Sequence, residues 1–176
     1  KRDSSPVTLA DFGSQAVINA LLAEYFPEDP VVAEEDAHIL RQGDRAELRA
    51  RVLESVNEFL PSLSESDVLD AIDRGRDAGS SKRFWTLDPI DGTKGFIRGD
   101  QYAVALALIV DGKVRLGVLG CPNLRAVSLD EGPAGVVLAG VRGRPAVSLQ
   151  LGSGVQRDIR VSPAVRDADI VLCESV

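Results

Sequence analysis

The dipeptide Asp111-Gly112 stands between two long apolar runs, residues 102–110 and 113–121. An Asp-Gly pair in this setting predicts a two-residue type I′ turn, because that turn needs positive φ at both of its central residues. The sequence therefore predicts an antiparallel hairpin of two long strands. With this turn, small side chains would face large ones across the hairpin, Ala107 opposite Leu116 and Ala105 opposite Val118.

Helical patterns precede the hairpin. Thr8 and Asp11 fit a capping box, and apolar residues recur after them at helical spacing to give a helix that ends near residues 25–27. Similar patterns that begin at Asp44 and Ser64 predict a second and a third helix. Other short apolar runs predict strands at 31–33, 83–87, 126–129, 135–141, 146–151, 158–161 and 169–173. Helices followed by strands of this kind predict a layered α/β or α+β fold, an antiparallel sheet packed with helices.

Composition narrows the class of protein. The chain has 176 residues, 44% of them apolar, which is enough to bury a core, and its formal net charge is −7. That charge would repel nucleic acid and anionic membrane surfaces. No apolar run reaches the ~18 residues of a membrane span, and residues 1–6 lack the apolar region of a signal peptide. We therefore expect a soluble, cytoplasmic protein that has neither nucleic acid nor a membrane as its partner.

Cysteine and histidine are scarce. Cys121 and Cys173 are too few and too far apart to suggest a disulfide framework or a thiolate metal site. The single His38 excludes a site built on several histidines of this chain. Chemistry that depends on a soft metal is therefore not expected.

An acidic turn follows one of the predicted strands. Asp88 and Asp91 lie three residues apart around Pro89, which fixes its own φ and biases the residue before it toward extended geometry. The two carboxylates can therefore converge on one point beyond the strand, and hard divalent cations prefer such oxygen ligands. Gly92 lets the main chain approach a ligand, and a helix that began near Thr93 would turn its free N–H groups toward an anion. The turn indicates a phosphate-ester site built on magnesium.

Several motifs, in the same order along the chain, carry a resemblance to a known family. They span nearly the whole sequence and are Ser5-Pro6-Val7-Thr8 with Asp11, Val32-Ala33-Glu34-Glu35, Asp88-Pro89-Ile90-Asp91-Gly92-Thr93 and Cys121-Pro122-Asn123. The set resembles the lithium-sensitive, magnesium-dependent phosphatases, which include inositol monophosphatase, fructose-1,6-bisphosphatase and 3′(2′),5′-bisphosphate nucleotidase. The nucleotidase branch is the most similar, on Thr93-Lys94-Gly95-Phe96 followed by Arg98-Gly99-Asp100-Gln101-Tyr102.

The resemblance implies a metal site. The carboxylates of Glu34, Asp88 and Asp91, together with the Ile90 carbonyl, would hold about two or three Mg²⁺ ions. Li⁺ and Ca²⁺ would inhibit the enzyme.

The resemblance also implies catalytic roles and a substrate. Asp11 and Thr93 would form a relay that orients the attacking water, and the amides of Gly92 and Thr93 would bind the phosphate. The substrate implied is a small phosphorylated nucleotide, adenosine 3′,5′-bisphosphate, which is hydrolysed to AMP and phosphate. 3′-Phosphoadenylyl sulfate is a second candidate substrate. The enzyme would be a monomer that acts in sulfate assimilation.

Two domains follow from the same resemblance. Residues 1–157 would form the N-terminal, metal-binding catalytic α+β domain of an inositol monophosphatase-like fold, and residues 158–176 would begin a second α/β domain. The family's second domain carries a Trp-Asp-x-Ala-Ala-Gly motif that completes the metal site, and nothing in this sequence matches it. Methionine is also absent, even at position 1, so we expect this sequence to be part of a longer chain.

Simpler interpretations of the same residues remain open. Asp11 could serve only as the acidic member of a capping box. Residues 34–36 could form an ordinary solvated acidic turn, and Asp88 and Asp91 could do no more than shape their own turn. The alternative functions are an inositol phosphate or fructose-bisphosphate phosphatase of the same superfamily, and a non-catalytic interaction module.

Overall fold

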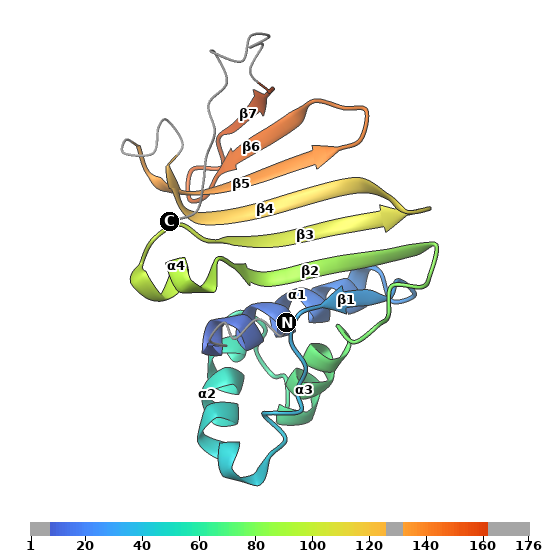
Figure 1. Ribbon diagram of the computed structural model, residues 1–176. Coiled ribbons are helices and arrows are strands. Elements are labelled where there is room, and N and C mark those ends of the chain that lie inside the picture. The colour runs from blue at the N-terminus through green and yellow to red at the C-terminus, as the bar shows by residue number, and fades with distance from the viewer. Residues whose placement is uncertain (1–7, 126–131, 162–176) are drawn as a thin grey trace.

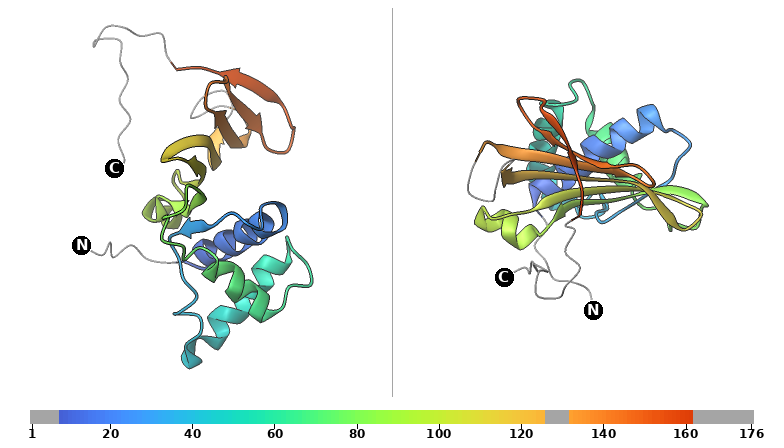
Figure 2. Two further views of the ribbon diagram at one scale, coloured as in Figure 1. Left: turned by 90° about the vertical axis from the view of Figure 1, so that its right-hand side faces the viewer. Right: turned by 90° about the horizontal axis from the view of Figure 1, so that it is seen from above.

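The computed structural model describes residues 8–125 and 132–161. Its helices are α1 Leu9–Tyr25, α2 Ala46–Asn57, α3 Glu65–Asp73 and α4 Thr93–Arg98, with a 3₁₀ turn, η1, at Gly43–Arg45. Its strands are β1 Val31–Ala33, β2 Arg83–Asp91, β3 Ala103–Val110, β4 Lys113–Arg125, β5 Ala134–Val141, β6 Ala146–Gln150 and β7 Gln156–Ile159. These strands form one sheet in the order of the sequence. α1, α2 and α3 gather at its β1–β2 end (Figure 1), and Figure 2 shows the later strands extending away from them.

Capping boxes begin two of the helices, as the sequence predicts. At α1 the Thr8 side chain accepts from the backbone while the Asp11 carboxylate accepts from the Thr8 N–H. Ser64 and Asp67 do the same at α3. Each box satisfies N–H groups that a helix start leaves without intrahelical partners.

The second helix differs from its prediction. It begins at Ala46 rather than at Asp44, which lies inside η1, and no side chain caps it. The 3₁₀ turn replaces the cap, because the N–H of Arg45 donates to the carbonyl of Gln42 at 3.1 Å.

Two clusters of buried side chains hold these layers together. One fills the space between α1, α2 and α3, and its largest members include Phe12, Leu40, Val52, Val56 and Ile72. The other joins α1 to the sheet through Leu22, Val31 and Trp85. α1 is therefore the element that lies between the other helices and the strands. The predicted α+β fold with helices packed on a sheet is confirmed.

The sheet is mixed rather than purely antiparallel. β1 pairs with β2 in parallel, with Ala33 opposite Leu87, and the following strand pairs are antiparallel. The chain between β1 and β2 includes α2 and α3, and a crossover of that length can return to the start of a parallel strand, as a short turn cannot. The antiparallel prediction was wrong at this pair because it considered the strands after residue 83 alone.

The hairpin of β3 and β4 is confirmed, and so is its turn, because Asp111 and Gly112 have φ of 51° and 68°. The predicted facing pairs are wrong by one residue. Leu108 lies opposite Leu116, and Ala105 lies opposite Leu119. Arg115 is an extra residue that bulges out of β4, and one inserted residue moves every later pair along by one position.

The remaining strand predictions have mixed outcomes. The strands predicted at 135–141 and 146–151 are β5 and β6, and the strand predicted at 158–161 is β7, which begins two residues earlier. Strands predicted at 126–129 and 169–173 lie outside the described residues. β7 pairs with β6 across the predicted boundary between residues 157 and 158, and the division into domains stays a prediction. In the part of the chain that the structure describes, no helix is long and apolar enough to cross a membrane.

Asp29 joins the end of α1 to the sheet. Its carboxylate accepts from Arg83 Nε at 2.8 and 2.9 Å and from Trp85 Nε1 at 3.0 Å. Hydrogen bonding from Arg83 lowers the pKa of Asp29 below its usual range. A carboxylate of this kind stabilises the fold above the pKa that it has in the unfolded chain, and the contribution is lost as the pH falls through its folded pKa.

We predict that Asp29→Asn lowers the free energy of unfolding at pH 7 by about 1 kcal/mol, a figure reduced because Arg83 is partly exposed to solvent. Urea unfolding of the full-length protein would measure it. The difference from the parent should shrink once the pH falls below ~4, since Asp29 is then protonated in the unfolded chain. Asp44→Asn, in an exposed pair at 3.9 Å, is the control and should change little at either pH. A loss that is independent of pH would contradict the ionic origin.

Candidate metal and phosphate site

The parallel pairing of β1 with β2 creates the site. Ala33 lies opposite Leu87 in the last pair between the two parallel strands, so the next residues, Glu34 and Asp88, follow it on the same side, although β2 itself continues to Asp91. A side-chain hydrogen bond joins Glu34 and Asp88. Two residues predicted as metal ligands from segments far apart in the sequence are therefore neighbours.

Asp11 approaches the same edge from the first turn of α1. It is buried, with 2% of its surface exposed, and its Oδ2 accepts from the N–H and the hydroxyl of Thr8. Its negative charge also helps to raise the pKa of Glu35 and of Asp88. The capping role of Asp11 is thus confirmed, and it does not keep the residue away from the other acids.

The acids at this edge oppose one another's ionisation. Burial raises the pKa of Glu35 to about 7, and the charges of Asp11 and Glu34 add to the effect. Burial and the charge of Asp91 raise the pKa of Asp88. We call Asp11, Glu34, Glu35, Asp88 and Asp91 the acidic cluster. Carboxylates gathered in this way favour either a proton or a cation.

The chemistry of this donor set fits Mg²⁺, which prefers carboxylate and carbonyl oxygens. The side chains do not form a complete coordination site: within residues 8–125 and 132–161, no three acidic, histidine or cysteine side chains are grouped closely enough to hold an ion. The structure thus brings Glu34, Asp88 and Asp91 to one edge of the sheet without closing them on a point.

The turn between Asp88 and Thr93 is held by its own hydrogen bonds. Asp88 Oδ1 accepts from the N–H of Ile90 at 3.1 Å, and the Thr93 hydroxyl donates to the Ile90 carbonyl at 3.0 Å. Gly92 has φ of 87°, which favours glycine, and it is the residue before α4. The helix start that the sequence suggested near Thr93 is confirmed.

Asp11 and Thr93, the two residues of the predicted relay, are not hydrogen-bonded to each other in this conformation. Among the described residues no hydrogen bond links Thr93 to Asp11, because the Thr93 hydroxyl donates to Ile90 and Asp11 accepts from Thr8. A rotation of the Thr93 hydroxyl group would be needed to change its acceptor. The catalytic roles of Asp11 and Thr93 therefore stay predictions.

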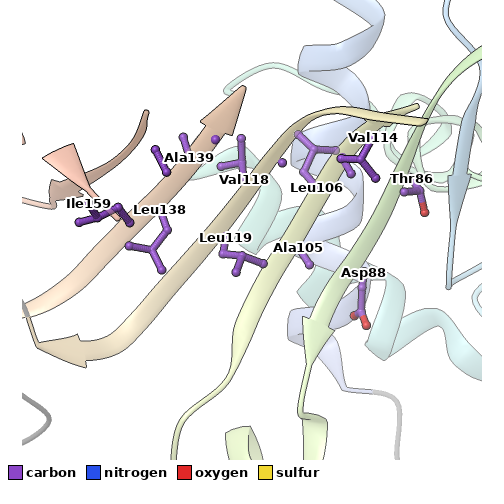
Figure 3. Close-up of a pocket in the computed structure, with 14 residues that line it drawn as sticks. Thr86, Asp88, Ala105, Leu106, Val114, Val118, Leu119, Leu138, Ala139 and Ile159 are labelled. Carbon is purple, nitrogen blue, oxygen red and sulfur yellow. The ribbon is translucent and has the colours of Figure 1, made fainter. Parts of the chain in front are cut away.

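One member of the acidic cluster, Asp88, borders a pocket on the sheet. Asp88 lies at one side of a shallow pocket of about 480 Å³ that extends over β3, β4 and β5, and Figure 3 shows its carboxyl group near the end of β2. Among the described residues that line this pocket, Asp88 is the only charged one. Small residues line much of this pocket and leave the space above the sheet unfilled. They include Ala105, Ala107, Gly117 and Gly140.

α4 sits tightly on the loop that follows it. An added Cβ on Gly95 would lie 2.5 Å from the backbone oxygen of Gln101. The rings of Phe96 and Tyr102 meet edge to face with their centroids 4.9 Å apart. Arg98 is paired with Asp100 at 2.8 Å. These contacts fix the segment that carries Gly92 and Thr93.

Sequence reasoning missed the buried amides of α1. Gln15 and Asn19 are fully buried, and Gln15 binds the backbone of Glu35. A signal was present, because Asp11, Gln15 and Asn19 follow one another at intervals of four residues and so share one face of the helix. Buried polar side chains on one helix face need polar partners, and Gln15 and Asn19 find theirs in backbone carbonyl groups.

Comparison with known proteins places the chain. Residues 1–171 match the inositol monophosphatase family. The chain belongs to this family. It is 42% identical over 204 residues to a 3′(2′),5′-bisphosphate nucleotidase of Emericella nidulans, a match that covers 100% of this chain and 57% of the relative. It is 50% identical over 140 residues to the probable 3′(2′),5′-bisphosphate nucleotidase 3 of Arabidopsis thaliana, which covers 73% of this chain and 39% of the relative.

The resemblance stated from the motifs is thereby confirmed, and the chain spans 57% of one of these relatives and 39% of the other. Among solved structures, an IMPase/NADP phosphatase complexed with Mg²⁺ and phosphate is 21% identical, with a TM-score of 0.47 over 84% of this chain and 40% of that one. A staphylococcal inositol monophosphatase-1 soaked in LiCl matches with the same TM-score of 0.47 over 84% of this chain and 39% of its own.

We predict that Gly95→Ala displaces α4, because the oxygen that the new methyl group meets belongs to the backbone and cannot rotate away. The free energy of unfolding of the full-length protein should fall by about 1–3 kcal/mol. Hydrogen exchange of residues 92–98 should accelerate. Gly13→Ala is the control: nothing lies within 4 Å of its added Cβ, so a gain of about 0.5–1 kcal/mol is expected. Parent-like stability and hydrogen exchange in Gly95→Ala would contradict the close packing of α4 against the loop that follows it.

Proposed function

We propose that the whole protein is a divalent-metal-dependent phosphatase that removes the 3′-phosphate of adenosine 3′,5′-bisphosphate to give AMP and phosphate. 3′-Phosphoadenylyl sulfate is the second substrate that we propose. The observation that carries the proposal is the acidic cluster, which gathers hard oxygen ligands beside a turn of the Asp-Pro-Ile-Asp-Gly-Thr type. The names of the relatives support the choice of a nucleotide bisphosphate.

Glu34, Asp88, Asp91 and the Ile90 carbonyl would hold Mg²⁺ ions. Bound ions would supply a Lewis acid for the phosphoryl oxygens and a lower pKa for an attacking water. Ca²⁺ would inhibit, because its longer bonds and looser geometry misplace the reacting groups. Inhibition by Li⁺ rests on the family resemblance alone.

The chain's own groups would orient the reaction. The Thr93 hydroxyl would accept a hydrogen bond from the attacking water and pass its own proton toward Asp11. The amides of Gly92 and Thr93 would donate to the phosphate oxygens. A bond would then form between the water oxygen and phosphorus as the bond from phosphorus to the ribose 3′-oxygen breaks, and that oxygen would take a proton from solvent to become the 3′-hydroxyl of AMP, with no covalent phosphoenzyme.

The rival functions differ in substrate or in chemistry. A phosphatase for inositol phosphates or fructose bisphosphate would use the same acidic cluster, since the family takes its name from such a substrate. A non-catalytic module would bind neither Mg²⁺ nor phosphate productively. We also propose that the protein is a monomer of the cytoplasm that acts in sulfate assimilation, and its net charge of −7 disfavours nucleic acid and anionic membranes as partners.

We predict that the full-length protein with Mg²⁺ hydrolyses adenosine 3′,5′-bisphosphate at a kcat/KM at least about tenfold above that for inositol 1-phosphate or fructose 1,6-bisphosphate, a difference of ~1.4 kcal/mol in transition-state binding. Phosphate release over a panel of the three substrates measures it. Faster turnover of inositol 1-phosphate would overturn the substrate while leaving the phosphatase intact. No release from any of them would favour the non-catalytic module.

We predict that Asp91→Asn and Glu34→Gln each reduce kcat at least about 100-fold, because each removes a charged metal ligand with little change of shape. Titration calorimetry should show fewer or weaker Mg²⁺ sites, with unfolding unchanged. Asp36→Asn is the matched control, an exposed acid in the same segment whose hydrogen bond to the His38 N–H the amide can keep. If Glu34→Gln titrates like the parent, residues 34–36 are an ordinary acidic turn.

A further inference from the structure

Gln15 makes an unusual set of contacts for a buried amide. Its side chain is fully buried, and its Oε1 accepts from the Glu35 N–H at 3.0 Å. Its Nε2 donates to the Glu35 carbonyl at 2.6 Å and to the Ile72 carbonyl at 2.9 Å. Both N–H groups and the oxygen of the amide are therefore used, and all three partners are backbone atoms.

The two bonds to Glu35 hold that residue from both sides. An amide that binds the N–H and the carbonyl of the same residue fixes its rotation as well as its position. Glu34 precedes it, and the side chain of Glu34 is exposed. That side chain meets Asp88 through a hydrogen bond, and the backbone of Glu34 is held between the end of β1 on one side and the Gln15 contact on the other.

Gly75 keeps the space that Gln15 needs. A Cβ added there would lie 2.9 Å from Gln15 Nε2 and 2.6 Å from the Cβ of Ala33. The Gly75 carbonyl also accepts from the Ala33 N–H at 2.7 Å. Gly75, two residues after the end of α3, thus leaves room for the Gln15 amide next to the last residue of β1.

We propose that Gln15 is a positioning residue that sets the place of Glu34, and that α1 links Glu34 to Asp11. This inference rests on the proposed function, because it takes Glu34 as a metal ligand. Asp11 and Gln15 are four residues apart on α1, so their side chains lie on the same helix face. One helix carries the predicted proton acceptor and, one turn later, the amide that holds the loop of the metal ligand.

Asn19 provides the matched control. It lies one turn beyond Gln15 on the same helix, it is fully buried, and its Nδ2 donates to the Ala71 carbonyl of α3 at 2.9 Å. It has no hydrogen bond to residues 34–36 among the described contacts. Removing the Asn19 amide should therefore disturb the core in a similar way without moving the loop.

The test compares Gln15→Met, Gln15→Asn and Asn19→Leu in the full-length protein. Gln15→Met keeps the length of the side chain and loses its hydrogen bonds. We expect its Mg²⁺ affinity in titration calorimetry to fall about tenfold or more, as it does when a residue that holds a metal ligand in place is changed. The Mg²⁺ concentration for half-maximal activity should rise in parallel, with a smaller change of kcat at saturating Mg²⁺. Asn19→Leu should leave Mg²⁺ affinity unchanged even if its unfolding midpoint falls as far as that of Gln15→Met.

Hydrogen exchange of residues 31–38 in metal-free protein gives a readout that needs neither metal nor substrate. It should accelerate in Gln15→Met and stay parent-like in Asn19→Leu. If Gln15→Met does not fold, Gln15→Asn, one methylene shorter, decides the question with the same measurements. Parent-like Mg²⁺ affinity and exchange in the Gln15 variant that folds would overturn the proposal. A parent protein that binds no Mg²⁺ would instead refute the proposed function, while the exchange result would still report on the Gln15 contact.

Discussion

The parallel pairing of β1 with β2 is the constraint on which the site depends. Parallel strands run in the same direction, so the residues that follow Ala33 and Leu87 lie on the same side of the paired stretch. An antiparallel pair in this place would put Glu34 and Asp88 at opposite ends. The crossover that makes the pairing possible contains α2 and α3, whose buried face packs against α1. The three-helix layer and the acidic edge are thus consequences of the same connection.

The two ends of β1 have opposite electrostatic characters. Before it, Asp29 is held by Arg83 and Trp85, and its pKa is lowered. After it, Glu35 lies among other acids and its pKa is raised to about 7. The first end stabilises the fold at neutral pH, whereas the second is destabilised by its own charges until a proton or a cation neutralises them. A strand of three residues therefore joins a structural ion pair to the acidic cluster.

Local chemistry predicts part of this architecture from sequence. The capping boxes at Thr8 and Ser64 and the Asp111-Gly112 turn depend on neighbouring residues, so pattern alone finds them. The bulge at Arg115 and the parallel pairing of β1 depend on contacts with distant strands, which no local pattern encodes. The acids that we propose as metal ligands lie in local motifs that pattern alone can find, whereas the contact of Gln15 with Glu35 joins residues that are twenty positions apart in sequence.

The backbone is fixed at the site while two of the acidic side chains remain exposed. Several features fix the path of the backbone at the site. They are the strand hydrogen bonds of β1, the Gln15 amide, Pro89 and the αL conformation of Gly92. Glu34 and Asp91 themselves are exposed, and the Glu34 side chain is hydrogen-bonded to Asp88. If the acids are metal ligands, as we propose, their affinity for a metal depends on how rigidly the backbone presents them, and the residues of α1 that hold this backbone then matter as much as the acids themselves.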